Sequence, residues 1–310
     1  MPRHLALIIL LLCSHAYAEN AYVAGALGEL FPGAGYMYLG QTQKAALSSS
    51  LVAPLAAPYY IPVTSTRDKS ILINTFYAAS NLYNYTVYDS FQMGLDLSGR
   101  PTQVVNIPHY ELKDLLKAPF QASHYSTWKT YAPLGIAAAA MGFIIGRHGI
   151  SQNLTTAHAL KAIPLIFLQS VLVGVGEESQ FRGFQYPAFS QLTGSAIWGN
   201  VLQSVSFGLC HTRLGVCTSP YGTGQIFIAT ETVDTRQVYL DSRLSPGIDT
   251  SYFIDTALFG LYTGWVSSSE KDGLLLTITM HAAFDSLGIL TDLLSKGDTG
   301  RLYLSVSLPF

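Results

Sequence analysis

Ionisable side chains interrupt the apolar part of this sequence at three points, and their residue types suit hydrolytic chemistry. The residues at these points are Glu177, Glu178 and Arg182, then Phe207 and His211, then His281 and Asp285. Ionisable groups within apolar helices are energetically costly, and they usually face a cavity or a charged partner. A glutamate and two histidines from separate segments can polarise a water molecule, and the same groups can bind a divalent metal such as zinc. The pattern therefore predicts a hydrolytic site, with a metal ion as an open alternative.

The spacing within the first group separates two roles. Glu178 and Arg182 are four residues apart and share one face of a helix, where the guanidinium can neutralise the carboxylate. Glu177 lies about 100° away around a regular helix, so it remains available as a base. His281 and Asp285 have the same four-residue spacing, which predicts that they are neighbours on a second helix.

Each group also has a purely structural interpretation. Glutamate pairs are common on solvated helices, a lone histidine is often a hydrogen-bonded core residue, and a histidine–aspartate pair can join two helices. Short motifs give many false matches. Taken together, in this order and in apolar surroundings, the three groups favour a functional site.

The composition predicts that the helices carrying these residues lie in a membrane. Of the 310 residues, 49% are hydrophobic and only 12% are charged, whereas a typical soluble domain has about 25% charged residues. Nineteen tyrosines and fifteen phenylalanines suit a protein with two membrane interfaces. The net charge of −2 provides no basic surface for nucleic acid. We therefore predict a lipid bilayer as the surroundings and no nucleic-acid partner.

Apolar runs in the second part of the chain predict the membrane helices. These runs are residues 131–146, 159–176, 195–209, 252–266 and 274–294. The ionisable groups follow the second and third runs or lie inside the fifth. We therefore predict an all-α fold, a polytopic membrane helical bundle, with its core at 126–310.

The first part of the chain is less regular. Residues 1–18 fit a signal peptide, because a short apolar run precedes the small-x-small pattern Ala16-Tyr17-Ala18. Residues 19–125 form a separate hydrophobic region, in which prolines predict a kinked membrane hairpin at 45–63. A long helix is expected at 71–95 and a polar linker or surface helix at 96–128.

A glycine-rich motif stands near the start of this region. Its sequence is Pro32-Gly33-x-Gly35-x-x-Tyr38-x-Gly40-x-x-x-Lys44-Ala45. It resembles a motif of small bacterial membrane domains and predicts no function.

Two further segments are not expected to be helical. Residues 212–250 are rich in polar and β-branched residues, which predicts a short polar loop or hairpin insertion. The last ten residues alternate apolar and polar side chains up to Phe310, which predicts a strand-like tail. Many outer-membrane barrel chains also end in phenylalanine, but the rest of the chain lacks the repeated alternating segments of a barrel. A barrel is therefore the weaker alternative.

Over roughly residues 126–295 the three ionisable groups resemble the signature of the CAAX-protease and bacteriocin-processing (CPBP) membrane proteases. That signature is Glu-Glu-x-x-x-Arg, then Phe-x-x-x-His, then His-x-x-x-Asn or Asp. The resemblance implies an all-helical membrane core around a water-filled cavity. It implies that Glu177 is the general base that activates water together with His211, while His281 and Asp285 stabilise the oxyanion. Glu178 and Arg182 then hold the site through their ion pair, and Phe207 belongs to the supporting residues.

The resemblance implies an intramembrane endopeptidase that hydrolyses a peptide or a membrane-associated protein. No cofactor is firmly implied, since a metal-free glutamate mechanism and a bound divalent metal such as zinc both fit the signature. The expected location is a bacterial inner membrane, with several membrane passes. The alternative is a catalytically inactive scaffold or immunity-type protein of the same fold, because every motif residue can be structural.

Overall fold

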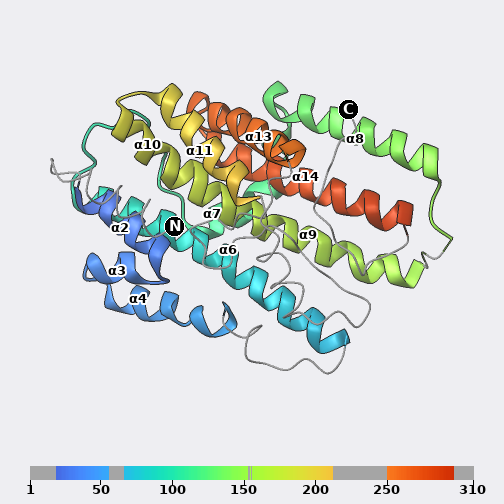
Figure 1. Ribbon diagram of the computed structural model, residues 1–310, viewed down its shortest axis with the longest axis horizontal. Helices are drawn as coiled ribbons and strands as arrows, with labels where there is room; N and C mark the ends of the chain where they lie inside the picture. The colour runs from blue at the N-terminus through green and yellow to red at the C-terminus, as the bar shows by residue number, and fades with distance from the viewer. Residues whose placement is uncertain (1–18, 56–65, 153, 155, 212–249, 297–310) are drawn as a thin grey trace.

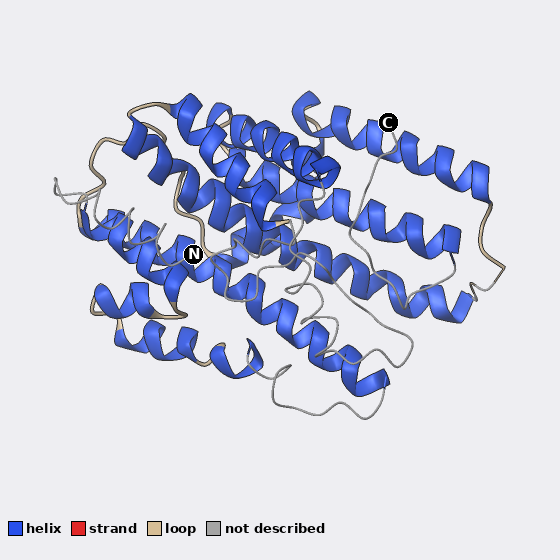
Figure 2. Cartoon of the chain, viewed as in Figure 1, coloured by secondary structure: helices blue, strands red, loops and turns tan. Residues whose placement is uncertain are grey.

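The computed structural model describes residues 19–55, 66–152, 154, 156–211 and 250–296, and every regular element within these ranges is a helix (Figure 2). The N-terminal helices are α2 (Glu19–Leu30), α3 (Ala34–Tyr38), α4 (Thr42–Ser49), α6 (Thr66–Leu97) and α7 (Leu112–Lys117). They are followed by the short η1 (Ala118–Phe120) and η2 (Ala122–Tyr125), α8 (Trp128–His148), α9 (Thr156–Glu178), η3 (Ser179–Gln185), α10 (Tyr186–Thr193), α11 (Ala196–Cys210), α13 (Thr250–Ser269) and α14 (Gly273–Lys296). The expected signal peptide, the strand-like tail and nearly all of the expected 212–250 insertion lie outside the described residues.

Helix α9 lies at the centre of the packing. It packs along α14 on one side and against α6 on another, and α8 lies beyond α14 (Figure 1). Helix α2 packs on α6, while α10, α11 and α13 form a neighbouring group. Helices α6 and α14, which are far apart in the sequence, therefore both pack on α9.

Three helical stretches are long and apolar enough to cross a membrane. They are Trp128–Arg147, Ala162–Thr193 and Gly273–Ser295, and they include most of three predicted apolar runs. The predicted runs 195–209 and 252–266 also form helices, α11 and α13, but these are not among the three stretches. Helix α11 has 15 residues, about 22 Å at 1.5 Å per residue, which is shorter than the ~30 Å hydrocarbon core of a bilayer.

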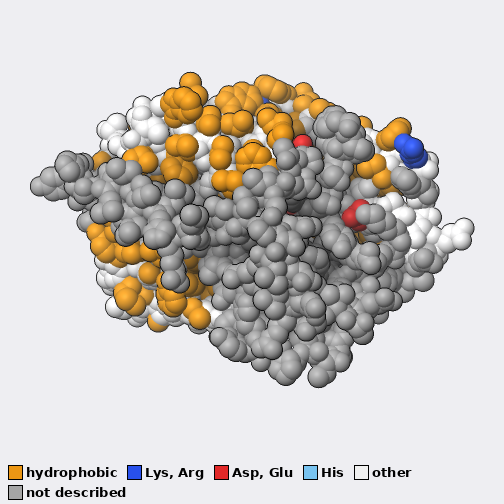
Figure 3. Space-filling model, viewed as in Figure 1, with side chains coloured by type: hydrophobic (Ala, Val, Ile, Leu, Met, Phe, Trp, Pro, Cys, Tyr) orange, Lys and Arg blue, Asp and Glu red, His pale blue; other side chains and the backbone are white. Residues whose placement is uncertain are grey.

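The outer surface of α8 is apolar. Ile136 and Phe143 are 71% and 69% exposed, and the main packing partner of the helix is α14. Figure 3 shows hydrophobic side chains over much of the described surface on this face, with few charged groups among them. Apolar exposure of this extent marks a surface that contacts lipid or another protein, so it fits the membrane environment predicted from composition.

The glycine-rich motif folds α2, α3 and α4 tightly against α6. Gly33 and Gly40 have φ angles of +88° and +73°, which glycine adopts without steric cost. Gly35 lies so close to the carbonyl of Ala24 and the side chain of Ser90 that a β-carbon would not fit. The motif is therefore explained by backbone geometry rather than by chemistry.

The chain leaves regular α geometry directly after Glu178. Residues Ser179–Gln185 form a π-helical turn, η3, and all seven are buried. The regular helix assumed from the sequence for 177–182 is therefore wrong beyond its first two residues. Gly183 lets the ring of Tyr88 on α6 approach the backbone of η3 more closely than a β-carbon would allow. Such π-helical turns are rare and often occur at functional sites.

Candidate active site

The fold brings the predicted ionisable residues together from three separate parts of the chain. Helix α9 ends with the two glutamates, η3 carries the arginine, His211 caps the C-terminus of α11, and α14 carries the remaining pair. We call Glu177, Glu178, Arg182, His211, His281 and Asp285 the core cluster. All of these residues are buried or only slightly exposed.

The carboxylate of Glu177 lies close to the imidazole rings of both His211 and His281. Its Oε2 atom is 3.6 Å from Nε2 of His281 and 3.7 Å from Nε2 of His211. These separations exceed a direct hydrogen bond, but they are short enough for a water molecule bonded to Oε2 to reach a ring nitrogen. The Glu177 side chain is 16% exposed, whereas the Glu178 side chain is 0% exposed. Of the two adjacent carboxylates, Glu177 is therefore the one that a substrate can reach.

Glu178 is buried between a guanidinium and an imidazole. Its Oε1 atom is 3.2 Å from Nη1 of Arg182 and 2.7 Å from Nδ1 of His281. Two fully buried charges require mutual compensation, because each loses its hydration. Glu178 therefore links the positions of Arg182 and His281.

Both imidazoles are oriented through their Nδ1 atoms. Nδ1 of His211 is 2.7 Å from the carbonyl oxygen of Phe207, and Nδ1 of His281 faces the Glu178 carboxylate. A carbonyl oxygen can only accept, so Nδ1 of His211 carries the hydrogen. Both rings consequently present Nε2 towards Glu177.

Asp285 lies beside the outer nitrogen of His281. Its Oδ2 atom is 3.7 Å from Nε2 of His281, so that nitrogen lies within 4 Å of two carboxylates, Glu177 and Asp285. The predicted i,i+4 pairing on one helix is present as a side-chain contact.

Aromatic rings surround the charged groups. The guanidinium of Arg182 lies 4.3 Å from the ring centroid of Phe207, and Phe259 lies 5.3 Å from the His281 ring. Phe207 also packs edge-on against Phe181, with centroids 5.0 Å apart. These rings exclude water from the cluster, which strengthens its electrostatic interactions. The cation–π contact adds to the stability of the buried guanidinium.

Several polar atoms of the core cluster remain without hydrogen bonds. Within the described part of the chain, no hydrogen-bond partner is found for Oε2 of Glu177, Oε2 of Glu178, Oδ2 of Asp285 or the three guanidinium nitrogens of Arg182. Most buried polar side-chain atoms in proteins are hydrogen-bonded, and exceptions call for an explanation such as catalysis. The core cluster therefore has unused hydrogen-bonding capacity.

Metal binding was an open alternative from the sequence. Among the residues that the structure describes, no group of three or more His, Cys, Asp or Glu side chains has an arrangement that could hold a metal ion. Nδ1 of His281 is also engaged by Glu178. We derive no chemical step through a metal.

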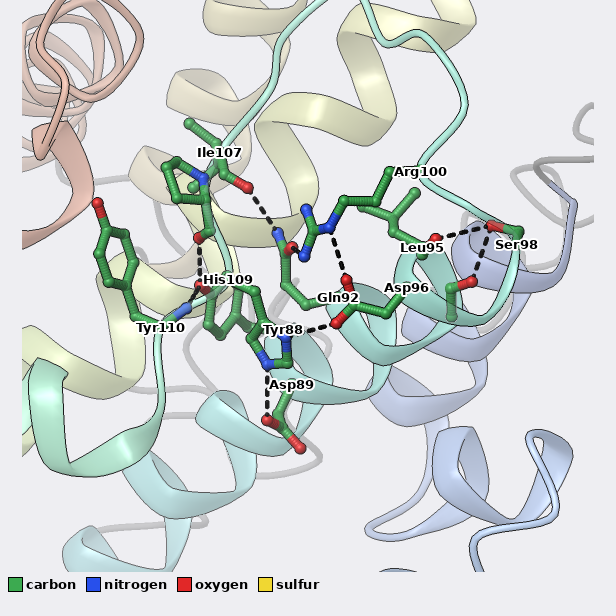
Figure 4. Close-up of polar contacts among 12 residues, drawn as sticks. Tyr88, Asp89, Gln92, Leu95, Asp96, Ser98, Arg100, Ile107, His109 and Tyr110 are labelled. Carbon is green, nitrogen blue, oxygen red and sulfur yellow. Dashed lines mark hydrogen bonds and ion pairs between the residues drawn. The ribbon is translucent and has the colours of Figure 1, made fainter.

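A second group of charged residues, which the sequence analysis did not predict as a group, lies at the C-terminal half of α6 (Figure 4). We call Lys44, Asp89, Asp96, Arg100 and His109 the α6 cluster. His109 bridges the two aspartates, with Nε2 3.2 Å from Asp89 and Nδ1 2.8 Å from Asp96. Nζ of Lys44, a residue of the glycine-rich motif, is 2.8 Å from Oδ2 of Asp89.

Glu29 is a further buried acid that the sequence analysis did not single out. It is 3% exposed and accepts hydrogen bonds from the side chains of Gln180 and Gln185 in η3. A single acidic residue within the apolar stretch of α2 is the signal that could have identified it, since such residues require a partner.

The comparisons with known proteins support the class of protein that this site defines. Residues 159–287 match the family model described as type II CAAX prenyl endopeptidase Rce1-like. The matched segment includes every residue of the core cluster, and residues 1–158 lie outside it. No curated protein and no solved structure matched the chain. The matched family is one of membrane proteases. Over residues 159–287 the chain is therefore similar to this family, in agreement with the resemblance noted from the sequence.

Proposed function

We propose that the protein is an intramembrane endopeptidase whose core cluster hydrolyses a peptide bond with a water molecule activated by Glu177. The observation that carries this proposal is the position of one carboxylate oxygen of Glu177, whose side chain is partly exposed, 3.6–3.7 Å from two imidazole nitrogens. A carboxylate near two oriented imidazoles is suited to general-base catalysis, for which contact through one water is sufficient.

In the proposed reaction, the carboxylate of Glu177 takes a proton from water while the water oxygen attacks the peptide carbonyl carbon. His211 orients this water through Nε2, because its Nδ1 hydrogen is donated to Phe207. The carbonyl oxygen becomes an oxyanion. When the C–N bond breaks, the proton held by Glu177 passes to the leaving nitrogen, so that one water is consumed for each bond cleaved.

His281 and Asp285 are proposed to stabilise the oxyanion. A doubly protonated His281 donates Nδ1–H to Glu178 and Nε2–H to the oxyanion. An ionised Asp285 cannot donate, so it acts either as a protonated donor or by favouring the positive charge of His281. Donors that are already positioned before the reaction commonly contribute several kcal/mol. Arg182 supports the arrangement by neutralising Glu178.

The proposed substrate is a peptide or a membrane-associated protein segment. The matched family is described as a type II CAAX prenyl endopeptidase, and the three helical stretches that are long and apolar enough to cross a membrane favour a substrate presented from the bilayer. The proposed location is a membrane, with the chain crossing it more than once.

The test uses the full chain purified in detergent and incubated with synthetic peptides that join an apolar segment to a short polar tail. One set carries a prenylated cysteine followed by the three further residues of a CAAX sequence, and the other has the same sequence without the prenyl group. The reaction is run in H₂¹⁸O, and mass spectrometry is expected to find one ¹⁸O atom in each new C-terminus. Glu177→Gln should abolish the products. Glu270→Gln, the same change at a partly exposed glutamate paired with Lys129, should not.

Two results would contradict the proposal. Equal cleavage by wild type and Glu177→Gln would remove the role of Glu177. No product from the folded wild type in either peptide set would favour the inactive scaffold.

A further inference from the structure

The N-terminal region contacts the active-site segment through a buried carboxylate. One oxygen of Glu29, Oε1, accepts both hydrogen bonds, from Nε2 of Gln185 at 2.8 Å and from Nε2 of Gln180 at 3.2 Å. All three side chains are at most 5% exposed. Glu29 belongs to α2, which lies outside the matched segment 159–287.

The two glutamines lie on either side of Arg182 along η3. A π-helical turn closes wider rings than an α-helix and usually occurs as a single turn within one, so contacts from outside the turn help to fix it. Glu29 provides such a contact near each end of the turn. Because Arg182 lies between the two glutamines, its position depends on how η3 is held.

Close packing against apolar residues of the N-terminal region also restricts η3. Gly25 of α2 lies directly against the ring of Phe184, with no room for a β-carbon. Phe184 in turn packs against Phe91 of α6, with ring centroids 5.3 Å apart. These apolar contacts fix where η3 lies, and the two hydrogen bonds to Glu29 fix its rotation.

We propose that Glu29 is a positioning residue for the protease site, acting through Gln180 and Gln185 on η3. The effect passes from η3 to Arg182, from Arg182 to Glu178 at 3.2 Å, and from Glu178 to Nδ1 of His281 at 2.7 Å. Residues 19–30 are then a working part of the catalytic unit. This inference rests on the proposed function only for its effect on catalysis.

The contact geometry defines two informative variants. Since both hydrogen bonds reach a single oxygen, Glu29→Gln keeps the acceptor through its amide carbonyl and removes the charge. Glu29→Leu has a similar size and removes the acceptor. Asp89→Asn is the matched control, because Asp89 is also a buried N-terminal acid, but its hydrogen bonds go to Tyr36, Lys44, Tyr85 and His109 and not to η3.

The experiment measures peptide cleavage and hydrogen–deuterium exchange on the full-length purified chain. For Glu29→Leu we expect kcat to fall about tenfold or more, since small displacements of catalytic groups are costly. KM should stay within about twofold, because no substrate contact is removed. Backbone amides of residues 179–186 should exchange faster. Glu29→Gln should restore both properties, and Asp89→Asn should leave kcat per folded molecule and exchange in 179–186 unchanged.

The outcomes separate this inference from the proposed function. Wild-type kcat and wild-type exchange in Glu29→Leu would overturn the positioning role while the protease assignment stands. If Glu29→Leu and Glu29→Gln lose the same amount of kcat, the negative charge of Glu29 is required rather than its hydrogen bonds, and the positioning role is overturned. If the wild type cleaves none of the peptides, the protease proposal fails, and the exchange measurement still decides whether Glu29 holds η3.

Discussion

The core cluster and the α6 cluster contain the same kinds of side chain but satisfy them differently. Both combine carboxylates, histidine and a strong cation. In the α6 cluster, both oxygens of Asp89 have partners, Tyr36 and Lys44 on one and Tyr85 and His109 on the other. In the core cluster, buried oxygens of Glu177, Glu178 and Asp285 have no hydrogen-bond partner among the described residues.

The difference separates a stabilising network from a reactive one. A fully hydrogen-bonded carboxylate contributes to stability and has no lone pair left for a substrate. A buried carboxylate with an unused oxygen costs stability, and proteins retain this cost mainly where the group has a function. Charge and burial alone would not have distinguished the two clusters, since both contain buried acids next to histidine.

The largest expected effect is on catalysis, and it tests the core cluster directly. Glu177→Gln should lower the cleavage rate roughly 10³-fold, as expected for loss of a general base, which corresponds to about 4 kcal/mol of transition-state stabilisation. Its thermal midpoint in detergent should equal or exceed that of the wild type, because the variant removes an incompletely compensated charge. A strongly lowered midpoint would show that Glu177 is a structural residue and would remove the contrast between the clusters.

The next effect concerns the ion pair within the core cluster. Arg182→Met leaves the fully buried Glu178 without its cation and should destabilise the protein by about 3 kcal/mol. The double variant Glu178→Gln/Arg182→Met should recover more than half of that loss, since neither charge then remains buried alone. Thermal unfolding of the single and double variants measures both values. A double variant at least as unstable as Arg182→Met alone would contradict the pairing.

A smaller effect is expected in the α6 cluster, where a substitution should lower stability and leave activity unchanged. Asp89→Asn removes one of the charge partners of Lys44 and His109 and should cost about 1–2 kcal/mol of stability. The cleavage rate of the folded fraction should not change. A selective loss of kcat, at an unchanged thermal midpoint, would mean that the α6 cluster takes part in catalysis.

The smallest effect is a pH dependence of stability from His109. Its two ring nitrogens both face carboxylates, and the hydrogen bond with Asp89 raises the pKa of His109 above its usual value. A raised histidine pKa gives stability that is complete below the unfolded-state pKa of about 6.5. That stability is lost as the pH rises through the folded-state pKa. The thermal midpoint should therefore fall between roughly pH 6.5 and moderately alkaline pH.

Asp89 and Asp96 set the acid limit of the pH range over which the α6 cluster stabilises the protein. Burial opposes ionisation of Asp89, but hydrogen bonds from His109, Lys44 and Tyr36 outweigh it and lower its pKa. The stability contributed by ionised Asp89 is present above about pH 4 and is lost as the pH falls further. Asp96 is 44% exposed, so solvent screening keeps the His109 effect at about 1 kcal/mol or less. His109→Gln should abolish the alkaline dependence; a variant with an unchanged pH profile would assign it to another group.

The sequence predicted the core cluster because its signal is local and strong. Glu177, His211 and His281 each interrupt an apolar run, and the cost of such residues is independent of the rest of the fold. The runs at 131–146, 159–176 and 274–294 were found for the same reason, and the long helix at 71–95 corresponds to α6. The predicted roles of the site residues stay predictions. The boundary between the N-terminal region 19–125 and the core 126–310 also stays a prediction.

The features that were missed depend on contacts between distant segments. The π-helical turn at η3 is stabilised by contacts such as Tyr88 against Gly183, and no residue pattern within 179–185 announces them. Glu29 and Gln185 are 156 residues apart. His109 lies in a polar segment without periodicity, so only the three-dimensional structure places it between Asp89 and Asp96.

The order of the core cluster along the chain also has a consequence during biosynthesis. The glutamates on α9 are made about a hundred residues before His281 on α14, which at ~5–20 residues per second is a delay on the order of ten seconds. During that interval the growing chain contains the carboxylates without one of their imidazoles. Under the proposed mechanism the catalytic site is incomplete until the last described helix has been made, so a nascent chain cannot cleave its neighbours or itself before then.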